Sequence, residues 1–306
     1  MELTSGYHCQ HQPGDIQQFL VWINSLKADA LELIVVDDRK EKGNLEKLSS
    51  FVFAPHVELK IISFSLEGKA NAYNHMIYQA KYPMLMFVTS QHRFAVQEVS
   101  DMLKLAEDTN ADIVVAPIKH EGLPWHQRPL YPRAFSQARS IFDDPSLLAS
   151  FTDTVYAKLF KVSFLRQNKV HFLEFDTMLG IPFLSVAFAY KAKIAYAHWL
   201  SLCLGDEVFE EGHKDIFKGL DRIMQIYKSK HIDDLFVKEL NYLILRKIVV
   251  NNVLISKELS KDERKLLFRQ CKNYIKRRGV AWENPYFAAD DKWLRLNLLY
   301  VKMIIG

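Results

Sequence analysis

Residues 68–91, GKANAYNHMIYQAKYPMLMFVTSQ, join a helix-like segment to a strand-like segment that ends in polar side chains. Ala72, Met76 and Ala80 recur at helical spacing and predict an amphipathic helix. The apolar run MLMFV predicts a buried strand, and it delivers to its carboxyl end the polar side chains of Thr89, Ser90, Gln91 and His92. In α/β proteins this edge of the sheet faces the ligand crevice. The stretch therefore predicts an α/β fold with a binding site at the end of this strand.

The same alternation runs through the first half of the chain. An amphipathic helix is expected after QPGD, with apolar residues from Ile16 to Leu26 at helical spacing. Short apolar runs predict further strands at LELIVVDD (31–38), VELKIISF (57–64) and ADIVVAPI (111–118). Strands that alternate with helices of this length predict a mostly parallel sheet flanked by helices.

The second half of the chain is different. Residues 120–152 carry four prolines and no clear period, which is typical of a substrate-facing loop. After residue 215 only helical patterns occur, and they cover residues 216–227, 233–255, 260–278 and 290–305. We therefore expect a sheet domain over residues 1–210 and an α-helical C-terminal subdomain over residues 211–306.

Composition excludes several classes of protein. The chain is 49% hydrophobic and 25% charged, which is ordinary for a globular protein, and its net charge of +4 does not indicate a nucleic-acid partner. No apolar run reaches the length of about 18 residues that a membrane span needs. The start lacks the basic and apolar regions of a secretory signal. Cys9, Cys203 and Cys271 form neither a disulfide framework nor a zinc pattern, so we expect a cytoplasmic protein without a bound metal.

Two groups of residues mark a candidate ligand site. Asp37 and Asp38 follow a predicted strand, where a carboxylate can accept hydrogen bonds from a base or a ribose hydroxyl; a turn or helix-cap acid is the alternative. Gly68 and Lys69 lie at a strand-to-helix turn. A flexible turn, a helix N-terminus and a cation together suit a phosphate.

Taken in order, four segments resemble the family 2 glycosyltransferases, and in particular the bacterial members that build capsule, exopolysaccharide or teichoic-acid-type chains. They are SLKADALELIVVDD, GKANAYNHMIYQAKYPMLMFVTSQ, FTDTVYAKLFKVSFLRQNKVHFLE and GIPFLSVAFAYKAKIAY. The C-terminal segment GVAWENPYFAADDKWLRLNLLYVK also resembles the helical tail of those enzymes. The resemblance implies a GT-A fold, a nucleotide-sugar donor, and a glycan or lipid-linked acceptor.

The resemblance also assigns residues. Asp38, with Asp37 beside it, matches the acid that contacts the nucleotide base and ribose, and Lys69 and Asn74 match positions near the donor nucleotide. Three residues match a short element ahead of the acceptor region, namely Tyr156, Lys158 and Leu159.

The chain departs from the family at three places. Where the family carries a metal-binding Asp-x-Asp motif, this chain has Thr89, Ser90 and Gln91, whose neutral oxygens suit a hard divalent cation poorly. The family's catalytic base falls at Leu179 and Gly180, which cannot accept a proton. The first segment, TSGYHCQHQPGD, is more polar than the apolar first strand of the family.

Other residues are candidates for the missing roles, with a solvated loop position as the alternative for each. Glu174, Asp176 and Asp206 are candidates for the base. Arg93 is placed to stabilise a diphosphate leaving group without a metal, and His126 and Arg128 to bind diphosphate or an anionic acceptor.

Two functions are compatible with these features. The first is a glycosyltransferase of bacterial cell-surface polysaccharide synthesis that works by a metal-independent route. The second is a catalytically inactive GT-A protein that binds or assembles with an active glycosyltransferase.

The C-terminal segment raises a separate question of location. Residues 261–306 hold 11 Lys/Arg against 5 Asp/Glu. In its last helix, Trp293 and Tyr300 are interleaved with Lys292, Arg295 and Lys302. This helix either touches the inner face of the cell membrane or packs against the domain.

Overall fold

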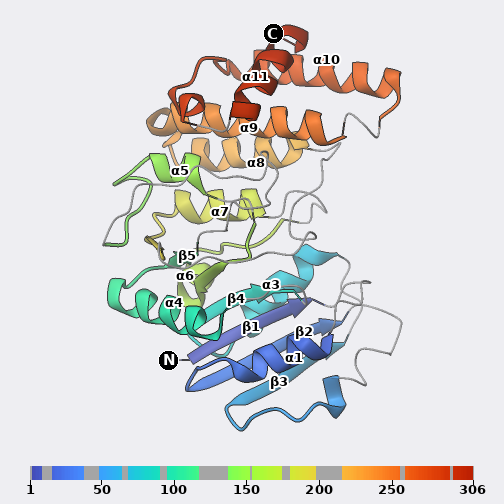
Figure 1. Cartoon of the computed structure of the whole chain (residues 1–306). Helices are drawn as coiled ribbons and strands as arrows, with labels where there is room; N and C mark the ends of the chain where they lie inside the picture. Colours follow the sequence, from blue (N-terminus) through green and yellow to red (C-terminus); the bar gives the residue numbers. More distant parts are fainter. Residues whose placement is uncertain are drawn as a thin grey trace.

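Seven strands form one sheet within the part of the chain that the structure describes (Figure 1). The computed structural model describes residues 2–8, 16–37, 48–63, 68–89, 95–116, 137–151, 154–173, 180–197, 216–255, 259–289 and 292–305. The strands are β1 (Glu2–His8), β2 (Ala30–Asp37), β3 (Val57–Ser63), β4 (Met84–Val88), β5 (Ile113–Val115), β6 (Lys158–Lys161) and β7 (Ile194–Tyr196). They lie in the order β3-β2-β1-β4-β6-β5-β7.

The sheet is parallel except at β6. Strand β1 pairs in parallel with β2 and β4, β2 with β3, and β5 with β7, whereas β6 runs antiparallel to β4 and β5. The carboxyl ends of β1 to β5 therefore meet the amino end of β6 at one edge of the sheet. The prediction of a mostly parallel sheet is confirmed.

The polar first segment forms a central strand. Thr4 Oγ1 donates to Glu32 Oε2 at 2.9 Å, and the same carboxylate oxygen accepts from the Lys81 amide at 2.8 Å. Thr4 and Glu32 are almost fully buried, at 0% and 2% exposure. Because these buried polar groups have partners, the segment occupies the middle of the sheet although it lacks the family's apolar pattern.

Helices cover both faces of the sheet (Figure 1). The helices of this part are α1 (Ile16–Ser25), α3 (Lys69–Gln79), α4 (Val96–Thr109), α5 (Ser146–Ser150), α6 (Val162–Gln167) and α7 (Gly180–Ala189). Helices α1 and α4 share one hydrophobic core with alternate strand residues such as Leu33 and Met86. Helix α3 packs on the other face with Ile34 and Phe87. The strands thus alternate their side chains between two cores, as buried parallel strands do.

The predicted helical C-terminal region is also confirmed. It contains α8 (Ile216–Ser229), η3 (Asp233–Phe236), α9 (Val237–Ile255), α10 (Lys261–Arg278), η4 (Pro285–Ala288) and α11 (Lys292–Ile305). The core on the α3 face of the sheet continues without interruption into these helices as far as Val301. The expected domain boundary at residues 210 and 211 lies outside the described residues.

Helix α10 shows how local sequence sets an element's limits. Ser260 accepts a hydrogen bond from the Glu263 amide, and the Glu263 side chain accepts one from the Ser260 amide, which closes a capping box. Gly279 ends the helix in the left-handed conformation, at φ 62°. The first turn carries acids and the last turn carries bases, which matches the helix dipole.

Four phenylalanines of the described residues between 164 and 188 belong to the core, whereas Tyr190 is exposed. Phe172 stacks on Phe183 at a centroid distance of 4.0 Å, and Phe164 and Phe188 are buried as well. Among the described residues, no helix combines the length and the apolarity that crossing a bilayer requires.

Candidate functional site

The candidate site lies at the sheet edge where the parallel strands end. Strand β1 ends at His8, β2 at Asp37, and β4 at Val88, directly before Thr89. His8 and Asp37 are buried, at 9% and 3% exposure, and Thr89 is half-buried. The predicted convergence of the strand ends is therefore present, and Asp37 is on this edge.

The turn before α3 has the form that the sequence predicts. Gly68 precedes the helix at φ 88° and ψ 155°, a conformation that is essentially restricted to glycine. As the N-cap residue it offers no side chain to the helix N-terminus, and the first turn of α3 contains no acidic residue. Lys69 is the first residue of the helix. The positive end of the helix dipole and a cationic side chain thus occur together, and both favour an anion.

Two tyrosines hold the Lys69 side chain. Its Nζ lies 5.6 Å from the centroid of the Tyr73 ring and 5.5 Å from that of Tyr156, within the range of cation–π attraction. The two tyrosine hydroxyls are hydrogen-bonded to each other at 2.6 Å. The His8 ring meets Tyr73 edge-on at a centroid distance of 6.3 Å. These contacts link the ends of β1, α3 and the segment before β6.

The pKa of the Tyr73 hydroxyl is well above its ordinary value. Burial is the main cause, and the neighbouring Tyr156 hydroxyl adds to it. Tyr73 is therefore neutral at physiological pH and acts at this edge as a hydrogen-bonding and aromatic group.

The turn that carries Tyr156 is fixed by the start of β6. Lys158 is fully buried, and its Nζ donates to the Thr154 carbonyl oxygen at 2.5 Å. The Tyr156 amide donates to Thr154 Oγ1 at 3.1 Å. Between these residues, Ala157 adopts φ 57°, which is rare for a residue with a side chain. Burial lowers the pKa of Lys158 to about 7.

The Asn74 side chain connects α3 to the backbone of Phe172. Its Nδ2 donates to the Phe172 carbonyl at 2.8 Å, and its Oδ1 accepts from the Phe172 amide at 2.7 Å. Phe172 in turn packs edge-on against Tyr73 at a centroid distance of 5.1 Å. The predicted contact of Asn74 with a nucleotide stays a prediction. Within the protein, the Asn74 side chain holds the backbone of Phe172, whose ring packs against Tyr73.

Most other predicted site residues lie outside the described residues. They are Asp38, Ser90, Gln91, His92, Arg93, His126, Arg128, Glu174, Asp176, Leu179 and Asp206. Gly180 is described: it begins α7, a helix in which every residue is buried. The predicted apolar helix is therefore present, with Gly180 as its first residue.

The side chains at the end of β4 do not fit a divalent metal. Thr89, Ser90 and Gln91 offer only neutral oxygens, whereas Mg²⁺ and Mn²⁺ favour carboxylates. Among the described residues, no three or more His, Cys, Asp or Glu side chains are grouped so that they could hold a metal ion.

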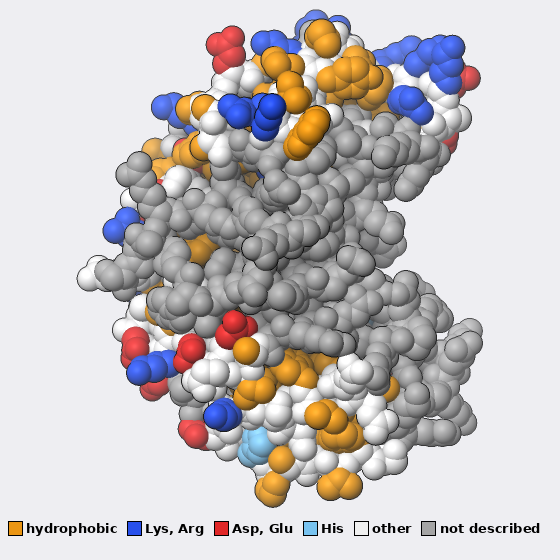
Figure 2. Space-filling model, in the orientation of Figure 1, with side chains coloured by type: hydrophobic (Ala, Val, Ile, Leu, Met, Phe, Trp, Pro, Cys, Tyr) orange, Lys and Arg blue, Asp and Glu red, His pale blue; other side chains and the backbone are white. Residues whose placement is uncertain are grey.

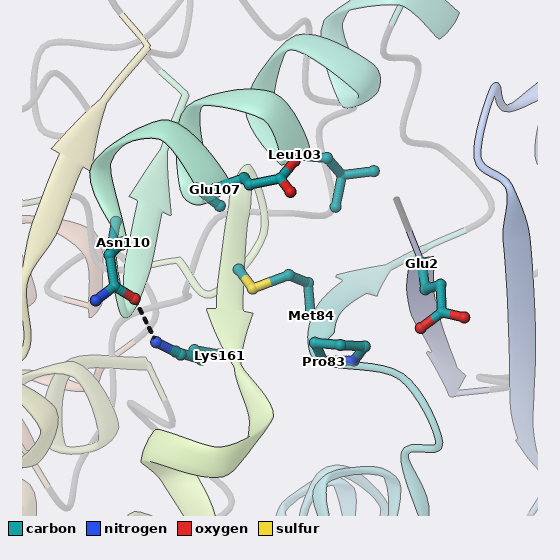
Figure 3. A pocket seen from close by; sticks show the side chains of 9 residues that line it. Glu2, Pro83, Met84, Leu103, Glu107, Asn110 and Lys161 are labelled. Carbon is teal, nitrogen blue, oxygen red and sulfur yellow. Dashed lines mark hydrogen bonds between the residues drawn. The ribbon is translucent and has the colours of Figure 1, made fainter.

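A pocket at the opposite edge of the sheet is separate from this site (Figure 3). It has a volume of about 390 Å³ and lies among the starts of β1 and β4, the end of α4, and Lys161. Lys161 Nζ donates to Asn110 Oδ1 at 2.7 Å within it. Because the parallel strands begin here, this pocket is on the side away from the predicted donor.

Sequence reasoning missed the roles of Tyr73 and His8. Tyr73 follows Lys69 by four residues on a predicted helix, and that spacing places the two side chains on one face. The signal for an aromatic neighbour of Lys69 was therefore available. The pairing of Tyr73 with Tyr156 joins positions that are 83 residues apart, and no local pattern reveals it.

The strand order, the reversed β6 and the polar edge define a GT-A fold, the α/β architecture of one class of nucleotide-sugar transferases. The family model described as glycosyl transferase family 2 matches residues 9–169, just over half of the chain, and the protein belongs to this family.

Solved structures support the same fold. The structure of S. aureus TarS 1–349 in complex with UDP-GlcNAc is similar with a TM-score of 0.72 and 13% identity, over 99% of this chain and 88% of that one. A longer TarS chain is matched over 53% of its length and 99% of this chain, with a TM-score of 0.68 and 14% identity. The mannosyltransferase PcManGT from Pyrobaculum calidifontis, in complex with GDP-Man and Mn²⁺, gives a TM-score of 0.53 and 11% identity over 98% of this chain and 86% of that one. Among curated proteins, no sequence matches this chain significantly.

Proposed function

We propose that the protein binds a nucleotide-sugar at the carboxyl edge of its sheet and transfers the sugar without a divalent metal. The observation that carries the proposal is the position of Lys69, a cation at the N-terminus of α3, on the edge where the strand ends converge. UDP-GlcNAc is the first donor to test, because the TarS structure of the same fold contains it.

The aromatic faces around Lys69 support this assignment. A carboxylate partner would neutralise an ammonium group, whereas the faces of Tyr73 and Tyr156 attract it and leave its net charge in place. An ammonium held in this way remains available to a diphosphate. Charge-assisted bonds of this kind are about twice as strong as neutral ones.

The proposed reaction has three parts. A base removes the proton from an acceptor hydroxyl, with Glu174, Asp176 and Asp206 as the candidates. The acceptor oxygen then bonds to the sugar's anomeric carbon while the bond from that carbon to the diphosphate oxygen breaks. Lys69, the α3 N-terminus and Arg93 stabilise the charge on the departing diphosphate, with His126 and Arg128 as further cationic contacts. Asp37 and Asp38 bind the base and ribose.

A second candidate function rests on Gly180. A glycine at the position of the family's base, together with neutral side chains at the end of β4, favours a catalytically inactive protein that binds or assembles with an active glycosyltransferase. In that case the acceptor site, the donor site or both serve binding alone.

Calorimetric titration separates the two functions. The protein is titrated with UDP-, CDP- and GDP-linked sugars, with and without Mn²⁺, and nucleoside diphosphate release is then followed in the presence of acceptors. We expect donor binding that is independent of Mn²⁺, and release of the diphosphate. Donor binding without release supports the inactive binding protein. If no donor binds, the transferase is contradicted, and co-purification of a second transferase then supports the inactive partner.

A matched pair of variants tests the role of Lys69. Lys69→Met keeps a long side chain in the helix but removes the charge, and we expect it to weaken donor binding about 10- to 100-fold, the value of one charge-assisted contact. Lys104→Met on the exposed face of α4 is the control and should bind as the wild type does. Equal affinities for the two variants would show that Lys69 does not contact the diphosphate.

The proposal also includes the acceptor and the place where the reaction occurs. We infer a glycan or lipid-linked acceptor of a bacterial cell-surface polysaccharide, and a place of action at the inner face of the membrane. The location has its own structural support, which is independent of the donor.

A further inference from the structure

Helix α11 exposes a row of large apolar side chains on the surface. The row, called here the α11 ridge, consists of Trp293, Leu296, Leu299, Tyr300, Met303 and Ile304, with exposed fractions between 39% and 78%. The opposite side of the helix packs inward through Leu294, Leu298 and Val301, which are buried. The helix therefore has two apolar faces, and only one of them is used by the fold.

The spacing of the ridge makes it continuous. Its neighbouring members are separated by one, three or four positions, so with 100° per residue they fall on one side of the helix. Figure 2 shows apolar side chains gathered at the end of the molecule where α11 and α10 lie, with Lys and Arg around them. Exposed Leu266 of α10 adds to the apolar surface of this end. Contiguous apolar surface bordered by charge marks an interaction site.

The charges of α11 are all positive. Lys292, Arg295 and Lys302 are exposed, and residues 292–305 contain no Asp or Glu. On the helical projection, Arg295 and Lys302 lie together along one border of the ridge, and Lys292 lies at its amino-terminal end. Trp and Tyr are the residues that favour the boundary between lipid and water.

These features favour one occupant. Two copies that met through this helix in a symmetric dimer would bring six cations together with no carboxylate on either helix to offset them, which opposes association. An anionic lipid surface instead offers phosphates to the cations and acyl chains to the ridge. We propose that α11 docks the protein on an anionic membrane, with the ridge inserted at the level of the headgroups.

The geometry is compatible with donor binding. In Figure 1, α11 lies at the end of the molecule farthest from β1, β2 and β3. Docking through the ridge therefore leaves the carboxyl edge of these strands uncovered. The membrane contact requires nothing of the donor site and does not depend on the proposed activity.

Vesicle flotation of the full chain tests the proposal. We expect the protein to float with vesicles of phosphatidylcholine and phosphatidylglycerol in equal parts, and to bind vesicles of phosphatidylcholine alone much more weakly. The triple variant Trp293→Ser, Leu299→Ser, Met303→Ser should lower partitioning about a hundredfold, because three largely exposed side chains no longer insert. The control variant Val52→Ser, Tyr78→Ser replaces exposed apolar residues elsewhere in the chain and should float as the wild type does.

A second set of variants isolates the charges. Lys292→Gln, Arg295→Gln, Lys302→Gln should lower binding to the anionic vesicles ~10- to 100-fold and leave binding to neutral vesicles unchanged. The control variant Lys27→Gln, Lys104→Gln, Lys169→Gln removes the same charge from exposed positions elsewhere in the chain. Brominated lipid should quench the fluorescence of Trp293. The variant Trp293→Phe shows which part of the total tryptophan fluorescence comes from this residue.

The possible outcomes are distinct. Flotation that depends on the ridge and its cations, with quenching of Trp293, supports the proposal even if no donor is bound. Flotation that is equal in the ridge variant and its control overturns it. A dimer that dissociates on substitution of the ridge, with no vesicle binding, overturns it in favour of a second copy.

Discussion

Asn74→Ala should destabilise the protein by about 2–3 kcal/mol. The substitution removes two hydrogen bonds to the backbone of Phe172, at 2.8 and 2.7 Å, which tie α3 to a position 98 residues later. Each bond is worth about 1 kcal/mol net, and the cost rises because the Phe172 amide and carbonyl are left without these partners. Phe172 is 1% exposed and backs Tyr73, so donor binding should weaken as an indirect result.

Urea unfolding at several pH values, followed by circular dichroism, checks this role. The control Asn297→Ala removes one exposed hydrogen bond within α11, to the Trp293 carbonyl, and should cost about 0.5 kcal/mol or less. The variant Asn74→Asp provides a pH readout. Its ionised carboxylate accepts from the Phe172 amide but faces the Phe172 carbonyl, to which it cannot donate.

The sign of the pH effect follows from that geometry. The folded protein favours the protonated, donating form of the carboxyl that Asn74→Asp introduces, so the pKa of this carboxyl is raised on folding. Stability is then lost as pH rises from the ordinary pKa of the carboxyl through its raised pKa, and it stays constant above that value. A variant Asn74→Ala that is as stable as the wild type but binds donor at least tenfold more weakly would refute the reasoning and make Asn74 a direct nucleotide contact.

Three further predictions concern other positions. Gly68→Ala should cost about 1–3 kcal/mol in urea unfolding, because φ 88° and ψ 155° suit only glycine; no loss would mean that the turn readjusts. Burial lowers the pKa of both Lys158 and Lys247 to about 7 in the folded protein, against 10.5 ordinarily. Between those values the unfolded chain binds more protons, so stability should rise with pH by at most about 1.4 kcal/mol per unit for each lysine. Urea midpoints between pH 7 and 9 should rise less in Lys158→Met than in the wild type, and equal slopes would contradict the assignment. Thr89→Asp combined with Gln91→Asp should create Mn²⁺ binding, detectable by electron paramagnetic resonance, with an unchanged urea midpoint; a lowered midpoint or no binding would show that the edge is not an inherited metal site.

Local sequence patterns predicted most elements because these elements depend on short-range periodicity. The run LELIVVDD predicted a strand at 31–38, and β2 covers Ala30–Asp37. The helical pattern at 260–278 corresponds to α10 at Lys261–Arg278. Gly68 and Lys69 were placed correctly at a strand-to-helix turn, because glycine and the change of period mark it together.

The contacts inside the candidate site could not be predicted in the same way. The resemblance assigned Asn74 to the donor site, which stays a prediction, and its hydrogen bonds to Phe172 could not be foreseen because the two residues are 98 positions apart. Lys158 gives no sign of its burial, since lysine is normally exposed. Its position follows from the antiparallel β6 strand, and pairing order across a sheet is not contained in any single strand's pattern.

The contrast between the buried strand β4 and its polar end explains why the fold does not depend on the side chains at that end. Met86, Phe87 and Val88 are at most 1% exposed, so the sheet depends on them. Thr89 is only half-buried, and exchanging a carboxylate for a hydroxyl there removes charge without removing core volume. Likeness of fold therefore carries no information on whether the edge still binds a donor. The charge of Lys69 is where donor binding can be tested, because a cation at a helix N-terminus opposes the helix dipole unless an anion lies beside it.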